Sequence, residues 1–188
     1  IADNNLRVLI VFHSHGNAFA SGVTYDGIPL TLVDSQTGDG RITLWYLINP
    51  PVGTADIVAT HTSSSYVAHM QAFDFKGADI TSPIRTAVKE ATTDVGSHTA
   101  DLTTTTVAGD IVIDYITTND DRSLTVGSGQ TLVSDGVTGS SADYRFGSSH
   151  ETASGTSTVM SYVVSGSNHT YMAVPVTGTT ATEVVGLD

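Results

Sequence analysis

Two histidines separated by one residue, His13 and His15, are the most chemically suggestive feature of the sequence. They end a run typical of a β-strand, in which side chains at positions i and i+2 point to the same face. Such a pair can share a transition metal, because imidazole is a good ligand for zinc, copper and iron. A metal site of this kind would also use a nearby carboxylate, but the next acidic residue is Asp26. The spacing therefore predicts no tightly bound transition metal at His13 and His15, although His61, His69 or His150 could supply a further ligand.

A second polar cluster, Asn119-Asp120-Asp121, follows a strong strand pattern. Calcium prefers oxygen-rich loops of this type. The spacing fits no calcium-loop pattern, however, and Arg122 stands directly beside the carboxylates. We interpret the cluster as a solvated turn and keep a structural calcium ion as the alternative.

The remaining acidic residues give little support for hydrolysis. A glycosidase needs two carboxylates across a cleft, whereas Glu90, Glu151 and Glu183 lie in stretches that we assign to loops or to the tail. Asp114 lies inside the apolar run IVIDYI, so we expect it to be buried and hydrogen-bonded rather than catalytic. The sequence has no nucleophile-elbow or nucleotide-binding glycine motif. We expect no enzyme activity and no cofactor.

Composition restricts the possible partners. The chain has 188 residues and a net charge of −12, so it should repel nucleic acid and anionic membranes. No apolar run approaches the 18 residues or so of a membrane span, and we expect no membrane insertion. Cysteine is absent, whereas threonine (29) and serine (20) are abundant. This surface chemistry is common in secreted and virion β-proteins, so we expect an extracellular, cell-surface or virion location.

Short strand patterns broken by Gly, Asn, Asp or Pro run through the whole chain. The best helical window, residues 86–93, has no sustained apolar face, and Asp26-Gly27 is a hairpin-turn signal. Trp45 lies in an apolar strand that Pro50 and Pro51 should end, so we expect it to be a buried core anchor. These features predict one all-β sandwich of about ten to twelve strands with essentially no helix.

Four segments in a fixed order resemble a jelly-roll-like β-sandwich module of large secreted bacterial and archaeal proteins and some viral structural proteins. They are LRVLIVFHSHGN, SGVTYDGIPLTLV, RITLWYLINPPVGTADIVAT and AFDFKGADITSPI. The resemblance covers the first half of the chain strongly, whereas the second half matches only in strand rhythm. It implies a fold and no particular function. Compared with that module, the chain lacks one strand at its start and has one extra strand at its end.

This departure from the module predicts how the protein works. A sandwich without one strand exposes an apolar groove and unpaired backbone groups, which polymerising proteins fill with a strand from a neighbour. We expect residues 1–176 to form the sandwich and residues 177–188 to form an extension that acts as an extra or donor strand. Its assembly contacts would come from Thr180, Thr182, Val184, Val185 and Leu187. The predicted function is a non-catalytic structural subunit that binds copies of itself in an extracellular filament, surface or virion appendage.

A carbohydrate-binding or adhesion module is the alternative function. Glycan recognition uses exposed aromatic rings near loops, and Tyr144 with Phe146 is the pair that fits this description. Asn168 begins a formal N-glycosylation sequon, which matters only for an extracellular protein in an organism that glycosylates. Electron microscopy of the purified material, filaments against monomers, separates the two functions.

Overall fold

The computed structural model describes residues 6–38, 40–61, 67–93, 96–138, 144–178 and 185–187, the last three by their backbone alone. All regular secondary structure in these residues is β-strand, which confirms the predicted all-β class. The strands, β1 to β16, are more numerous than the ten to twelve expected. No helix long and apolar enough to cross a membrane occurs among the described residues.

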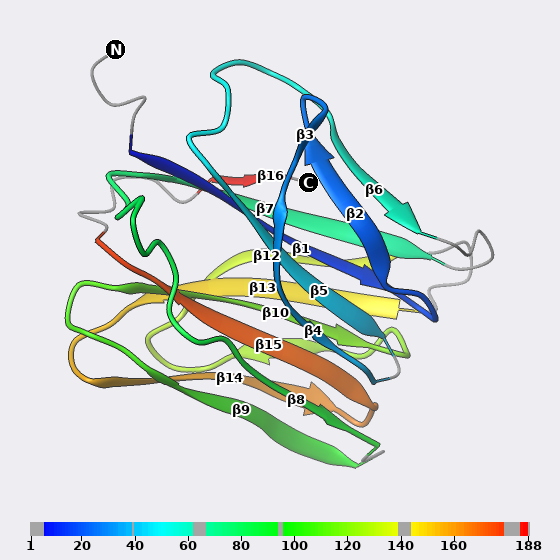
Figure 1. Ribbon diagram of the computed structural model, residues 1–188. Helices are drawn as coiled ribbons and strands as arrows, with labels where there is room; N and C mark the ends of the chain where they lie inside the picture. The colour runs from blue at the N-terminus through cyan, green and yellow to red at the C-terminus, as the bar shows by residue number, and fades with distance from the viewer. Residues whose placement is uncertain are drawn as a thin grey trace.

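Two five-stranded antiparallel sheets form the centre of the molecule (Figure 1). The first inner sheet has the order β16 (Val185–Leu187), β7 (Ala68–Lys76), β1 (Arg7–His15), β5 (Arg41–Ile48) and β4 (Thr31–Gln36). The second inner sheet has the order β12 (Thr131–Thr138), β13 (Tyr144–Thr152), β10 (Ile111–Thr118), β15 (His169–Val176) and β8 (Val88–Thr92).

Each inner sheet is covered on its outer face by a smaller sheet of three strands. The first outer sheet has the order β3 (Ile28–Pro29), β2 (Ala20–Tyr25) and β6 (Ile57–His61). The second has the order β11 (Leu124–Val126), β14 (Ser157–Ser165) and β9 (Ser97–Thr105). The described strands therefore form four layers, more than the two of the single sandwich that was expected (Figure 1).

Three apolar clusters fill the spaces between these four layers. Between the inner sheets, Val8, Ile10 and Phe12 of β1 pack against residues of β10 and β15. Alternate residues of β1, Leu9 and Val11, point the other way and pack under the first outer sheet. Both faces of β1 and β10 are thus covered, which explains why both strands are almost continuously buried and apolar rather than alternating.

The two halves of the chain repeat one strand order. After central strand β1 come an outer strand (β2), an inner hairpin (β4–β5), an outer strand that pairs with β2 (β6), and an inner strand that returns to β1 (β7). After β10, the strands β11, β12–β13, β14 and β15 take the same places. The short β3 extends only the first half.

The halves differ in what precedes the central strand. Before β10 come β8, which pairs with β15, and β9, which pairs with β14. No described strand precedes β1, so no counterparts of β8 and β9 come before it. The C-terminal strand β16 pairs with β7 and takes the place on that edge that β8 has beside β15. No described strand takes the place of β9.

The local sequence signals have mixed outcomes. Trp45 is buried, with 5% of its surface exposed, and Asp26 and Gly27 both have positive φ angles of 51° and 73°, as a tight hairpin turn requires. The best helical window, residues 86–93, forms no helix, as its lack of an apolar face indicated, whereas the assignment of the Tyr144–Phe146 stretch to a loop was wrong. These residues contribute to β8 and β13, because pairing with β15 and β10 overrides weak local patterns.

Candidate functional site

A cluster of histidines lies where β1 meets β6 and β7. The ring centroids of His13 and His15 are 6.4 Å apart, and His61 of β6 lies 5.8 Å from His13 and 4.6 Å from His15. His13 and His15 are each only 1% exposed. The fold thus brings His61, one of the three candidate partners, next to the predicted pair His13 and His15. His61 reaches them because the first outer sheet packs on the first inner sheet.

His13 is held in an environment that disfavours its charged form. Burial, and then the neighbouring His61, His15 and His69, lower the pKa of His13 to about 4. Neither Nδ1 nor Nε2 of His13 has a hydrogen-bond partner among the described residues. A buried, neutral imidazole with both nitrogens unpaired is costly, and such a group calls for an explanation.

The hydrogen bonds of His15 argue against metal binding at this cluster. Its Nδ1 accepts hydrogen bonds from the backbone N–H groups of Asn17 (3.2 Å) and Ala18 (3.1 Å). The neutral ring therefore carries its proton on Nε2, whereas a metal bound at Nε2 would need that nitrogen deprotonated. Within the described residues, no group of three or more histidines or carboxylates is arranged to hold a metal ion.

His69 belongs to the opposite face of the sheet. Its Nδ1 lies 2.8 Å from the hydroxyl of Tyr115, which also lies 2.7 Å from the hydroxyl of Ser14. The ring stacks on Phe146 with a centroid distance of 3.4 Å. His69 is therefore part of the packing between the inner sheets and lines the histidine cluster only at its margin.

The cluster at residues 119–121 has its side chains in three separate roles. The side-chain oxygen of Asn119 accepts a hydrogen bond from the hydroxyl of Ser167. The carboxylate of Asp121 forms an ion pair with Arg145 at 2.9 Å. At Asp120 the backbone oxygen, not the carboxylate, accepts from Thr118. The side-chain oxygens of Asn119 and Asp121 thus have separate partners rather than a shared ligand position of the kind that calcium uses.

Asp114 is fully buried and hydrogen-bonded, as expected from its position in an apolar run. Its Oδ1 accepts from the backbone and hydroxyl of Ser149 and from Tyr162, and its Oδ2 accepts from Tyr171 and Gln130. Burial raises the pKa of Asp114 to about 7, although these hydrogen bonds lower it. With no cavity beside it among those described, the carboxylate links β10, β13, β14 and β15 rather than facing a substrate.

A second histidine chain, missed in the sequence, links three strands of the second half. His98 of β9 lies 2.9 Å from Nδ1 of His169 on β15, and Nε2 of His169 lies 3.0 Å from the carboxylate of Glu90 on β8. Burial lowers the pKa of His169, while Glu90 acts in the opposite direction. Glu90 was assigned to a loop, and Glu151 too; both lie in strands, β8 and β13. Only knowledge of the strand pairing could have joined these distant residues.

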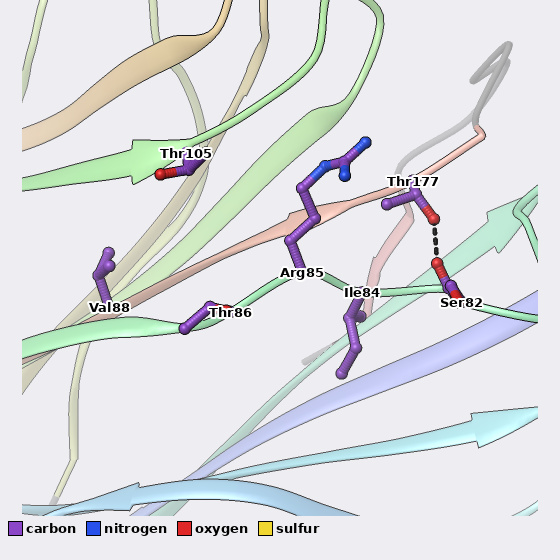
Figure 2. Close-up of a pocket in the computed structure, with 7 residues that line it drawn as sticks. All are labelled: Ser82, Ile84, Arg85, Thr86, Val88, Thr105 and Thr177. Carbon is purple, nitrogen blue, oxygen red and sulfur yellow. Dashed lines mark hydrogen bonds between the residues drawn. The ribbon is translucent and has the colours of Figure 1, made fainter.

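The largest hollow described is a groove of about 600 Å³ between the segment before β8 and the end of β15 (Figure 2). Ser82 and Thr177 are joined across it by a hydrogen bond. Arg85, which also lines it, makes two hydrogen bonds to the buried Asp110. The remaining lining residues are Ile84, Thr86, Val88 and Thr105. They include no acid, histidine or activated nucleophile, so the groove offers no catalytic group.

The residues considered for glycans and for glycosylation are partly buried. Tyr144 and Phe146 are both half-buried at the start of β13. One face of the Phe146 ring is stacked on His69, and the ring also packs closely against Gly136. Asn168 is half-buried in the turn before β15, and its side-chain oxygen is enclosed without a hydrogen-bond partner.

The tail pairs within its own chain. Val185 and Leu187 lie in β16, opposite Asp74 and Ala72 of β7. The other expected assembly residues, Thr180, Thr182 and Val184, lie outside the described residues. β16 covers three of the nine residues of β7, and no described strand pairs with the rest of that edge.

No protein-family model, curated protein or solved structure matches this chain.

Proposed function

We propose that this protein is a non-catalytic structural subunit of an extracellular filament, surface layer or virion appendage, and that its copies join by strand complementation. The observation that carries the proposal is the position of β16. A C-terminal strand fills, on the edge of β7, the place that β8 fills in the second half. The first half is completed by a segment that need not come from the same molecule.

Exchange of such a segment between copies has a low energetic cost. When β16 of one copy pairs with β7 of the next, it makes the same contacts that it makes within its own chain. Residues 179–184 separate β16 from the body of the domain. Six residues span up to about 20 Å when extended, which gives β16 a radius within which it can reach a neighbour. Head-to-tail exchange does not close unless its rotation makes a ring, so it generates a filament.

The titratable groups support a structural rather than a catalytic role. The pKa of Asp114 is raised to about 7, and the pKa of His13 is lowered to about 4. Both residues are buried within the packing of the sheets. Displaced pKa values indicate a functional site when they occur in a cleft. Neither residue lines the groove of about 600 Å³, and Asp114 lines none of the described cavities, whereas His13 lines a smaller cavity of about 130 Å³.

An engineered disulfide tests the exchange, since the chain has no cysteine of its own. Ala72 and Leu187 are directly opposite in the β7–β16 pair, so the double variant Ala72→Cys, Leu187→Cys should form a disulfide on oxidation. Under the proposal, a non-reducing gel shows a ladder of covalent oligomers. The single variant Ala72→Cys is the control and gives no ladder beyond the dimer.

Two outcomes of this experiment contradict the proposal. A product that stays monomeric after oxidation would show that β16 completes only its own domain. Filaments that still form after deletion of residues 178–188 would show that assembly does not use the tail. Electron microscopy of both preparations distinguishes these outcomes.

A further inference from the structure

Among the described strands, the outer edge of β6 is a place where the repeat of the two halves is left incomplete. β6 ends its sheet, and no described strand pairs with the side of it that faces away from β2. Its counterpart β14 is paired along nine residues with β9. The β9–β14 pair therefore shows how a further strand covers the equivalent edge in the second half.

β6 is a short edge strand of five residues with a register shift in its pairing with β2, but it carries no charged residue or proline to block its edge. Its sequence, Ile57-Val58-Ala59-Thr60-His61, has no acidic residue, lysine, arginine or proline, and Val58 is 53% exposed. The other long edge strands carry charges: Asp34 in β4, Lys89 and Glu90 in β8, Asp101 in β9 and Asp135 in β12. Natural edges are usually blocked by charges or bulges because an open edge recruits another strand. An edge without such charges is therefore a candidate binding surface.

A cavity lies beside this edge. It has a volume of about 130 Å³ and is lined by His13, Ala59, His61, Ala68, His69 and Met70, from β1, β6 and β7. No residue of β2 lines it. In the second half, β9 fills the corresponding space: its Ala100, Leu102 and Thr104 are buried.

Buried histidines near these two edges differ in their partners, although they lie on non-equivalent strands, His169 on β15 and His13 on β1. On the covered side, His98 of β9 lies within hydrogen-bond distance of the buried His169. On the open side, the buried His13 lines the cavity with neither ring nitrogen hydrogen-bonded. A side chain or backbone group from an added strand would supply the missing partner.

We propose that the outer edge of β6 is a strand-acceptor site for an extended segment of another protein chain. The segment has the chemistry of β9: it runs antiparallel to β6, directs small apolar or threonine side chains over the cavity beside His13, and exposes hydroxyl side chains on its other face. Backbone hydrogen bonds along β6 provide affinity, and the cavity selects the side chains that enter it. This site is independent of the proposed exchange of β16, which uses a different sheet.

The test uses a fluorescein-labelled synthetic peptide with the sequence of residues 97–105, SHTADLTTT. Its fluorescence polarisation is measured while the full-length protein is added. The expected result is saturable binding that Val58→Lys weakens at least about tenfold, since lysine on an edge strand opposes strand addition. Val163→Lys is the matched control: Val163 is equally exposed (50%) but lies on β14, whose edge is already paired.

Nuclear magnetic resonance locates the bound peptide. The proposal expects the amide signals of residues 57–60 and the ring signals of His13 to shift on binding, while those of β14 stay unchanged. A thermal melt verifies that Val58→Lys and Val163→Lys are folded.

Three outcomes would overturn the proposal. They are the absence of saturable binding, equal loss of binding in both lysine variants, and self-association of the unliganded protein that Val58→Lys abolishes. The last outcome would identify a second copy of β6, rather than a strand of the β9 type, as the occupant.

Discussion

The two halves of this molecule share one strand order but differ in how their edges are closed. In the second half, β8 and β9 precede the central strand and cover β15 and β14. In the first half, three residues of the C-terminal strand cover part of β7, and no described strand covers the outer edge of β6. By comparison with the second half, a further strand is expected along the rest of the β7 edge and along the outer edge of β6.

The buried polar groups differ between the halves in the same sense. Asp114, which precedes Tyr115 in β10, accepts hydrogen bonds from four residues. His13, which follows Phe12 in β1, has no hydrogen bond within the described residues. Asp114 is thus satisfied and His13 is not, although Ser148 and Thr170 of the second half also have buried side-chain oxygens without a hydrogen-bond partner. An incomplete edge and an unsatisfied side chain at the same place both indicate a missing partner.

The largest effect should follow from replacing Trp45, the main aromatic anchor under the first outer sheet. Trp45→Ala should lower the free energy of unfolding by about 3–5 kcal/mol, through lost burial and the cavity left behind. Urea denaturation measures this value. Hydrogen exchange should accelerate in β2 and β6 and stay slow in β9 and β14. Uniform acceleration in all four strands would mean that the halves do not differ in local stability.

The next effect concerns the pH dependence caused by Asp114. Since burial raises its folded-state pKa from 3.8 to about 7, the contribution of Asp114 to stability is fully present below pH 4 and is lost as the pH rises to 7. Asp114→Asn removes this loss. The free energy of unfolding of the natural protein, relative to that of the variant, should fall by up to about 4 kcal/mol between pH 4 and pH 7.5. Urea titrations at several pH values test this, and a constant difference would contradict it.

The sequence predicted the local features of the fold better than its closure. Alternating and apolar runs identified most strands, and the apolar surroundings of Trp45 and Asp114 correctly indicated burial. β8 and β13 were missed because their polar sequences become strands only through pairing with β15 and β10. The repeat was not visible either, since equivalent positions hold different residues, such as His13 after Phe12 and Ile116 after Tyr115.

The histidine cluster shows the same limit at the candidate site. The i, i+2 spacing placed His13 and His15 on one face, but only the packing of β6 on β1 brings His61 to them. The tautomer of His15 depends on two backbone N–H groups in the following turn. Neither contact has a periodic signal in the sequence, so the spacing alone could not say which of His61, His69 and His150 lies beside the pair.

The smallest effect, opposite in sign to that of Asp114, should come from His13. Its folded-state pKa is lowered from 6.5 to about 4, so the stability that its neutral form contributes is present above pH 6.5 and is lost as the pH falls toward 4. His13→Ile introduces the residue that follows Tyr115 in the second half. The variant should be at least as stable as the natural protein at pH 7.5, because it no longer buries an imidazole without hydrogen bonds. At pH 4 it should be more stable by up to about 3 kcal/mol.

Urea denaturation at pH 7.5, 5.5 and 4 gives both values, with Val58→Thr at an exposed position as the control. If His13→Ile and the natural protein lost stability equally on acidification, the buried imidazole would not be the acid-sensitive group of the open half.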